Sequence, residues 1–395
     1  FQIGATLIMG FTSLVFLKSI IKNLNDNKLD NIFFLSLLCF CFINIFFYRI
    51  SEHGTDRSAQ ILILLFITEL IVLINYYNFT KENIAKIIVL LGLIISLKSY
   101  YILYLVLTLV VFYYVIKDKK YIYIFEIFKN PFLYIFIFQL ILLLITNFFN
   151  SGCLIYPVSA TCFENFSWSI PLKEVVQMNN WYEQWSKAGA GPNFRVDNPE
   201  IFIQNFNWVN DWIEKYFFTK VSDLILGLSF LILIFLIVFK SKLNKDVKSS
   251  NKSNLILLVL FLLLAEWFYN HPALRYGGYP LIALLIFIPV SNFLGNKKFI
   301  NNNINNKVFS IIIICLSLFF LRNVDRILDE NKKYDYLPTK KINYQIDDRY
   351  FIIQNEFENI ISKNKDCIKK NKICKNHDNS NIKKEMGYLI FFKDK

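Results

Sequence analysis

Five ionisable residues stand within nine positions in the stretch 49–57, which lies between two strongly apolar runs. Glu52 and Asp56 supply carboxylates, His53 an imidazole and Arg57 a guanidinium. Carboxylates and imidazole move protons or hold a divalent cation such as Mg²⁺ or Mn²⁺, and a guanidinium pairs with phosphate. Asp56, Glu52 and His53 are therefore the candidate catalytic residues, and Asp56 and Glu52 the candidate cation ligands. A solvated turn at a membrane surface accounts for the same composition.

A second polar cluster occupies residues 266–280, again between apolar runs. Arg275 has the planar fork that suits a phosphate group, and His271 and Tyr276 add polar side chains around it. Glu266 follows an apolar run, where a charge is costly unless it has a partner. These four residues are candidates for substrate and phosphate binding.

Lys98, together with Arg57, is a further candidate for the phosphate site, and two glycines would shape the backbone around it. Lys98 is the cation of a short turn between two apolar runs, where it either contacts a phosphate together with Arg57 or extends to water beside the membrane. Gly277 and Gly278 follow Arg275 and would let the backbone approach a ligand closely.

The elements that position these clusters are apolar and long. The chain has 395 residues, of which 55% are hydrophobic, 17% aromatic and 18% charged, and its mean hydropathy is +0.40. This composition excludes a disordered chain, a collagen and a small disulfide scaffold, and it predicts an all-α polytopic membrane protein. Ten ranges predict transmembrane helices: Phe1–Ile21, Ile32–Tyr48, Ile61–Tyr77, Ile84–Leu97, Tyr100–Ile116, Phe132–Phe149, Val221–Phe239, Leu255–Tyr269, Pro280–Leu294 and Val308–Leu321.

The lysines and arginines indicate which loops face the cytoplasm. Fifteen lysines fall in the loops 22–31, 78–83, 117–131, 240–254 and 295–307, against four basic residues in the short loops of the other side. The positive-inside rule then places both polar clusters, the segment 150–220 and the tail 322–395 on the outer side. The same placement explains the net charge of +13 without a nucleic-acid partner.

The segment 150–220 contains five of the six tryptophans. Amphipathic helices are predicted over Pro171–Lys187 and Pro199–Phe218, with an apolar face on the first that includes Met178, Trp181 and Trp185. Such helices lie in the membrane interface, and Trp181 and Trp185 are also candidates for an acceptor platform. The predicted organisation is a transmembrane domain over 1–321 with this outer loop inserted, followed by a periplasmic region over 322–395.

Four cysteines stand in the predicted outer segments. Cys153 with Cys162, and Cys367 with Cys374, each enclose a short loop, and oxidising compartments favour disulfides. Two local disulfides fit this spacing, although four unrelated thiols remain an alternative. The second pair would support a small soluble α+β domain in the tail.

The amino-acid sequences of both polar clusters resemble those of an uncharacterised family of bacterial multi-pass membrane proteins. More broadly, the chain resembles the GT-C superfamily of integral-membrane glycosyltransferases. The stretches that carry the resemblance are residues 50–60 (ISEHGTDRSAQ) and 271–279 (HPALRYGGY). The superfamily takes sugars from polyprenyl phosphate at the outer membrane face and uses a carboxylate of its first external loop as base. The first span here runs inward, so an upstream span is expected. The resemblance then puts Glu52, His53 and Asp56 in the second loop and the base in an upstream segment.

The leading hypothesis is a glycosyltransferase of the bacterial inner membrane that takes its sugar from a polyprenyl-phosphate donor. The phosphate would meet Arg275, Lys98 and Arg57, and His53 or His271 would orient the acceptor. A transporter of lipid-linked glycans and a non-enzymatic envelope scaffold are the alternatives. The polar residues gather at one face instead of along the spans, which favours the enzyme.

Overall fold

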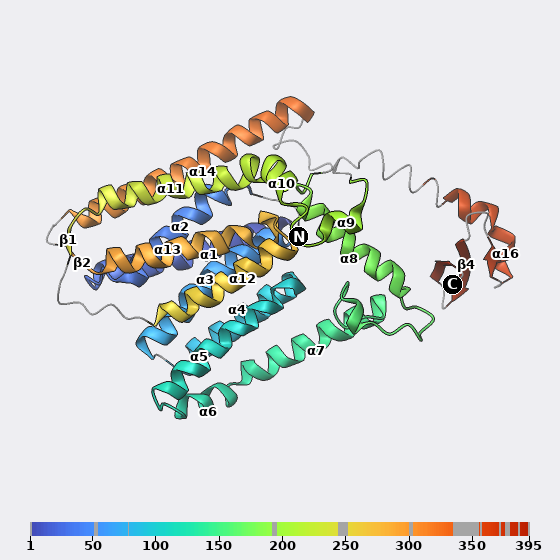
Figure 1. Cartoon of the computed structure of the whole chain (residues 1–395), viewed down its shortest axis with the longest axis horizontal. Coiled ribbons are helices and arrows are strands. Elements are labelled where there is room, and N and C mark those ends of the chain that lie inside the picture. The colour runs from blue at the N-terminus through green and yellow to red at the C-terminus, as the bar shows by residue number, and fades with distance from the viewer. Residues whose placement is uncertain are drawn as a thin grey trace. The chain divides into compact units, whose positions relative to one another are not determined.

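The computed structural model describes residues 2–50, 54–77, 79–191, 196–243, 252–299, 303–334, 355, 358–370, 373–375, 380–385 and 388–393. The chain divides into two units, Phe1–Arg326 and Ile327–Lys395. Figure 1 shows both, and each is described by itself.

The first unit is built from helices that cross it side by side (Figure 1). Its longer helical elements are α1 (Gln2–Asn25), α2 (Asn31–Phe46), α3 (Asp56–Tyr76), α4 (Lys81–Leu97), η1 (Ser99–Leu105) with α5 (Val106–Lys117), α7 (Pro131–Ser151), η3 (Ile213–Val221) with α11 (Ser222–Val238), α12 (Ser253–Asn270), α13 (Gly278–Gly295) and α14 (Ile304–Tyr334). Short helices are α6 (Ile122–Phe128), η2 (Ser159–Thr161), α8 (Leu172–Lys187), α9 (Pro199–Ile203), α10 (Val209–Trp212) and η4 (Leu274–Tyr276). The strands β1 (Lys242–Leu243) and β2 (Lys297–Lys298) pair at one end, and α8, α9 and α10 lie at the other.

All ten predicted apolar ranges fall on helices. Among the described residues, eight helical stretches are long and apolar enough to cross a membrane. The helices α2 and α4 have 16 and 17 residues and fall just below that length. The protein is therefore an all-α, multi-pass membrane protein.

The prediction of one amphipathic helix over Pro199–Phe218 is wrong. The chain forms α9, leaves the helical path at Gln204, and resumes at α10, which continues through η3 into α11. Asn205 adopts a positive φ of 50°, and the indole of Trp208 donates a hydrogen bond to its carbonyl at 3.0 Å. The apolar helix that was predicted to begin at Val221 consequently begins at Val209.

The core of the first unit lies around α2 and α3. Every residue of α2 from Ile32 to Asn44 is buried, whereas α7 exposes most of its apolar side chains. An unbroken apolar run fits a helix that is covered on all sides, which explains why so short a helix as α2 is central. At the β1–β2 end, Asn292 of α13 accepts a hydrogen bond from Asn31 and donates one to Ser253, each at 3.0 Å. These bonds tie α2, α13 and α12 together.

The described part of the second unit contains α16 (Lys365–Lys369) and the antiparallel strands β3 (Cys374–Lys375), β4 (Ser380–Glu385) and β5 (Tyr388–Lys393), in the order β3-β4-β5. A disulfide joins Cys367 to Cys374.

Candidate functional site

A carboxylate held between two cations lies at the end of the bundle opposite β1 and β2. Oδ1 of Asp56 accepts a hydrogen bond from the Lys98 ammonium. Oδ2 accepts a hydrogen bond from Nε of the Arg275 guanidinium at 2.9 Å and forms an ion pair with its Nη2 at 2.8 Å. Residues 56, 98 and 275, which are far apart in the chain, therefore form one charged cluster.

Each member of this cluster stands where a helix begins or ends. Asp56 is the first residue of α3, where the helix dipole favours a negative charge. Lys98 is the extended residue between α4 and η1, with φ −156° and ψ 114°. Arg275 lies in η4, within the link between α12 and α13. Apolar helices thus carry the charges to the membrane boundary, where water and ligands have access.

The link that carries Arg275, residues 271–277, is held by side chains of four other elements. The hydrogen bonds run from Gln60 Nε2 to the Arg275 carbonyl at 2.8 Å, from Trp212 Nε1 to the Pro272 carbonyl at 2.8 Å, from Trp267 Nε1 to the Ala273 carbonyl at 2.9 Å, and from the Leu274 amide to the Tyr216 hydroxyl at 2.8 Å. Buried backbone groups require such partners. The backbone under the guanidinium is therefore fixed before any ligand arrives.

The two glycines after Arg275 do not face a ligand, contrary to the sequence prediction. Gly277 adopts φ +104°, and an added Cβ would lie 3.1 Å from the ring of Tyr101. An added Cβ at Gly278 would lie 2.6 Å from the ring of Trp267. The glycines turn the chain and admit aromatic rings of the protein.

The charged cluster opens into a cavity of about 700 Å³. Its lining includes six candidate residues of the sequence analysis, namely Asp56, Lys98, Glu266, His271, Arg275 and Tyr276, and in addition Tyr100. Cavities of about 300–1,000 Å³ are typical of small-molecule sites. The size and the convergent polar groups make this cavity the candidate functional site.

His271 presents an uncharged imidazole to the cavity. Burial, and to a smaller extent the positive charges of Lys187 and Lys98, lower the pKa of His271 to about 4. Its Nδ1 atom is buried and has no hydrogen-bond partner among the described residues. The rings of Tyr100 and Tyr276 lie against the imidazole, with centroids at 6.0 and 5.7 Å. At neutral pH the uncharged imidazole can therefore form a hydrogen bond through Nδ1 with a hydroxyl group of a ligand.

Aromatic rings surround the two cations. The Lys98 ammonium lies 4.3 Å from the centroid of the Tyr276 ring, and the Arg275 guanidinium lies 5.3 Å from that of Trp185. Burial lowers the pKa of Lys98, while the charge and hydrogen bond of Asp56 oppose that shift. Asp56 is therefore the anion that favours the charged form of Lys98.

Glu266 has partners that explain its position at the end of an apolar helix. Its carboxylate accepts hydrogen bonds from the Tyr100 hydroxyl and, at 3.1 Å, from the Asn270 amide. The three residues form a polar wall of the cavity that connects α12 with η1.

The segment 150–220 supplies the facing wall, and the sequence analysis identified this segment but not the residues of the wall. Residues 155–158 and, on α8, Asn179, Tyr182 and Glu183 line the cavity. Glu183 is paired with the buried ammonium of Lys187, which also donates to the Ile203 carbonyl at 2.9 Å. Residues 179, 182, 183 and 187 are spaced so that they share one face of a helix. This polar stripe is the sequence feature from which the wall could have been predicted.

The predicted apolar face of α8 is wrong in part. Trp185 lies beside the site, with its ring centroid 6.0 Å from that of Tyr276. Trp181 and Met178 are exposed and do not line the cavity, whereas Lys187 is fully buried.

A disulfide between Cys153 and Cys162 anchors the loop whose tip, 155–158, enters the cavity wall. The Leu154 amide donates to the Thr161 carbonyl at 3.0 Å, and the Phe163 amide to the Gly152 carbonyl at 2.9 Å. Together these bonds close a narrow hairpin at the end of α7.

Not all predicted site residues enter the cavity. Arg57 lies over the Phe47 ring, 5.7 Å from its centroid, and is not among the residues that line the cavity. Glu52 and His53 lie outside the described residues. Within the described ranges no three His, Cys, Asp or Glu side chains gather as cation ligands, and both oxygens of Asp56 are taken by Lys98 and Arg275. The described side chains therefore do not fit a divalent-cation site.

The fold and this cavity define a multi-pass membrane protein with a pre-arranged charged site at one end of its helices. A family model described as "Domain of unknown function (DUF8201)" matches residues 4–282, which is more than half of the chain, and the chain belongs to this family. The matched region contains every residue of the cavity lining. No curated protein and no solved structure matches the chain.

Proposed function

We propose that the protein is an integral-membrane glycosyltransferase that takes a sugar from polyprenyl phosphate at the outer face of the bacterial inner membrane. The observation that carries the proposal is the convergence of Arg275 and Lys98 on Asp56, in a cavity of about 700 Å³ at the membrane boundary. A lipid-linked donor enters such a site with its phosphate at the boundary and its chain in the bilayer. Two cations on a fixed backbone suit that phosphate.

The donor phosphate takes the place of the Asp56 carboxylate between the two cations. The bond between the sugar C1 and the phosphate oxygen then breaks, and the electron pair stays on the phosphate, where Arg275 and Lys98 stabilise it. The acceptor hydroxyl forms the new bond to C1. Its proton passes to Asp56, which the phosphate has released from its ion pairs.

His271 and the aromatic side chains serve the acceptor. The neutral imidazole orients the attacking hydroxyl through the Nδ1 atom, which has no other partner among the described residues. Tyr182 and Trp185, on or beside the facing wall, offer flat apolar surfaces for a sugar or an acceptor.

The proposal extends to the parts of the chain that frame the site. We infer that α2 and α4 also span the bilayer, which gives ten spans, and that the lysine-rich loops at the β1–β2 end face the cytoplasm. The segment 150–220 then lies at the periplasmic surface. Because α14 continues to Tyr334, the predicted boundary at residue 322 falls inside a helix, and we infer that the small α+β domain of the tail is formed by the second unit, residues 327–395.

Transfer from defined donors tests this function. The full chain, purified in nanodiscs, is incubated with a panel of radiolabelled polyprenyl-phosphate hexoses and pentoses and with envelope glycan acceptors, and covalent products are separated. We expect Arg275→Gln and Asp56→Asn each to lower the rate by about 100-fold or more, as is typical when a group that stabilises the transition state is lost. Asp118→Asn is the matched control, because Asp118 pairs with Lys252 at 3.4 Å and does not line the cavity.

Unchanged transfer in both cavity variants would refute the assignment. Movement of the labelled lipid across liposomes without any covalent product would identify a transporter instead.

A further inference from the structure

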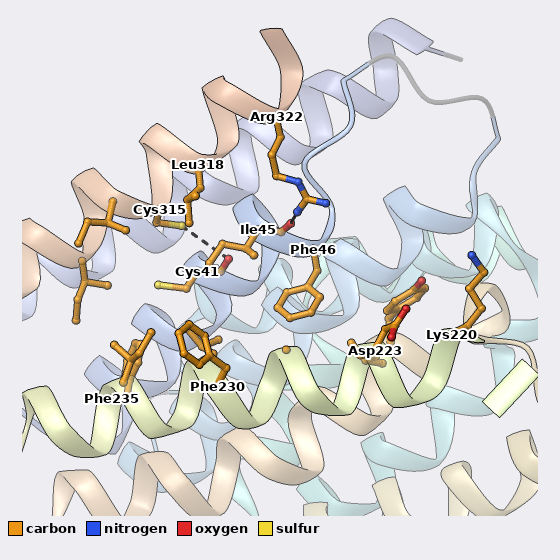
Figure 2. Close-up of a pocket in the computed structure, with 17 residues that line it drawn as sticks. Cys41, Ile45, Phe46, Lys220, Asp223, Phe230, Phe235, Cys315, Leu318 and Arg322 are labelled. Atoms are coloured by element: carbon orange, nitrogen blue, oxygen red, sulfur yellow. Dashed lines mark hydrogen bonds between the residues drawn. The ribbon is translucent and has the colours of Figure 1, made fainter. Parts of the chain in front are cut away.

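A second hollow of about 480 Å³ lies between α2, α11, α13 and α14 (Figure 2). Most of its lining is apolar: Cys41, Ile45, Phe46, Leu224, Gly227, Phe230, Leu231, Ile234, Phe235, Tyr279, Ile311, Ile314, Cys315 and Leu318. It shares no lining residue with the cavity around Asp56. We call it the α11–α14 groove.

All charged residues of the α11–α14 groove stand at one end. They are Lys220, Asp223 and Arg322, and all three are exposed. Figure 2 shows Lys220, near the end of η3, and Asp223, in the first turn of α11, with Arg322 across from them on α14. Apolar side chains fill the rest of the length, so the groove has a polar head and an apolar body.

The polar head lies at the same end of the bundle as the Asp56 cavity. Arg322 Nη1 donates to the Ile45 carbonyl at 2.6 Å, near the end of α2, and the guanidinium lies 3.6 Å from the centroid of the Tyr48 ring. Seven residues before Asp223, the Tyr216 hydroxyl of η3 accepts a hydrogen bond from the Leu274 amide of the link 271–277. The head therefore sits at the membrane boundary and the body runs into the bilayer.

The length of the groove corresponds to one leaflet. Asp223 and Phe235 are twelve positions apart on α11, which is roughly 18 Å at about 1.5 Å per residue. One leaflet provides roughly 15 Å, half of a hydrocarbon core of about 30 Å. A chain of a single-leaflet phospholipid fits this length, whereas a long polyprenyl chain would extend beyond it.

The charges at the head favour an anion. Two cations and one carboxylate leave a local excess of one positive charge, and neither Lys220 nor Asp223 has a hydrogen bond or ion pair with another described residue. A phosphodiester satisfies the lysine and the arginine, and a hydroxyl-bearing headgroup can donate to the carboxylate. A neutral zwitterionic headgroup would leave the excess charge uncompensated.

We propose that the α11–α14 groove binds an anionic glycerophospholipid of the outer leaflet, with its phosphate at Lys220 and Arg322 and one acyl chain along α11 and α14. The proposal does not depend on glycosyl transfer, because the groove and the Asp56 cavity are separate. It makes the bound lipid part of the packing between α11 and the rest of the bundle.

Binding is tested on the full chain with phosphatidylglycerol as the probe and phosphatidylcholine as the neutral reference, by native mass spectrometry from detergent micelles. Ile314→Trp fills the groove, and Ile313→Trp is the matched control, since Ile313 is also exposed on α14 but does not line the groove. Lys220→Gln with Arg322→Gln removes the cationic head, and Lys215→Gln removes a cation of the same helical segment outside the groove. We expect the groove variants to bind phosphatidylglycerol about tenfold more weakly than the unmodified protein. The control variants should bind it as tightly as the unmodified protein does.

A second measurement does not depend on any substitution. Phosphatidylglycerol with a photoreactive acyl chain is crosslinked to the unmodified protein, and the labelled peptides are identified. Labels concentrated on α11 and α14 support the proposal. Labels spread equally over α7, whose Ile135 and Phe138 are exposed, overturn it. Equal retention of phosphatidylcholine, or retention of polyprenyl phosphate in preference to phosphatidylglycerol, also overturns it.

Discussion

Asp56→Asn is the substitution that separates phosphate binding from catalysis. The carboxylate neutralises Lys98 and Arg275, so an incoming phosphate has to displace it from both. The amide that replaces it keeps the shape of the side chain and removes its charge. We therefore expect the variant to bind a phosphate ligand more tightly and to transfer sugar more slowly.

The size of the effect follows from exposure. Two unit charges 4 Å apart interact by about 1 kcal/mol in water and about 4 kcal/mol at an effective dielectric constant of 20. The side chains of Lys98 and Asp56 are 21% and 19% exposed, which places their pair between these limits. Arg275 is 56% exposed, so its share is discounted toward the lower limit. A net gain of about 1.5–3 kcal/mol in phosphate binding corresponds to roughly ten- to 100-fold in affinity.

The assay is binding of polyprenyl phosphate without a sugar to the purified protein in nanodiscs, at low and high salt. The affinity of Asp56→Asn should exceed that of the unmodified protein, and the excess should shrink as salt screens the cations. Asp118→Asn should change nothing. An affinity that is unchanged or lower in Asp56→Asn would contradict the idea that phosphate and carboxylate compete for the same two cations.

Three further outcomes are expected. The pKa of His271 is about 4 in the folded protein, below its value of about 6.5 in the unfolded chain, so the neutral imidazole stabilises the fold fully above about pH 6.5. This stability, up to roughly 3 kcal/mol, is lost as the pH falls toward 4. Thermal unfolding across this pH range should show the loss, and the loss should be smaller in His271→Gln. Trp212→Phe removes the hydrogen bond to the Pro272 carbonyl and should lower stability by about 1 kcal/mol, with a larger loss of transfer than of donor binding. Replacing Cys153 and Cys162 by serine opens a loop with a sequence separation of 9 and should cost up to roughly 3 kcal/mol, detectable as faster proteolysis between them.

The membrane helices were predictable because their signal is local. A run of apolar residues long enough to span hydrocarbon has few other structures available to it, so all ten ranges fall on helices. Helix ends were less predictable. The span that begins at Val209 was placed twelve residues too late, because the sequence between 209 and 220 is amphipathic and its helical continuation into α11 depends on contacts with the link 271–277.

The charged cluster was predictable in its composition but not in its pairing. Loop sidedness placed Asp56, Lys98 and Arg275 at one end of the bundle. It could not show that Arg57, the neighbour of Asp56, would point elsewhere. Successive residues of a helix are about 100° apart around its axis, so when Asp56 faces the cavity Arg57 turns toward Phe47. Which residue pairs with which is decided by helix rotation, and rotation depends on packing throughout the bundle.

The outer segment shows the limit of reading amphipathicity on one helix alone. The apolar stripe on α8 suggested that its tryptophans, Trp181 and Trp185, form a platform for the acceptor. The structure instead buries Lys187 and lets Glu183 and Tyr182 line the cavity, while Trp181 is exposed. A charged pair can occupy the inner face because its partners, the Ile203 carbonyl and the ring of Trp208, come from segments that no local pattern connects to α8.

The arrangement of the site favours catalysis by charges that are set in advance. Four hydrogen bonds with other elements hold the backbone of the link 271–277. Aromatic rings lie against both cations, Tyr276 against Lys98 and Trp185 against Arg275. The groups therefore need little rearrangement when charge develops on a leaving phosphate, which is the condition under which electrostatic stabilisation is most effective. Asp56 keeps the two cations together while no ligand is present. In the proposed mechanism the phosphate releases this carboxylate, so the site would gain its base only when the donor is bound.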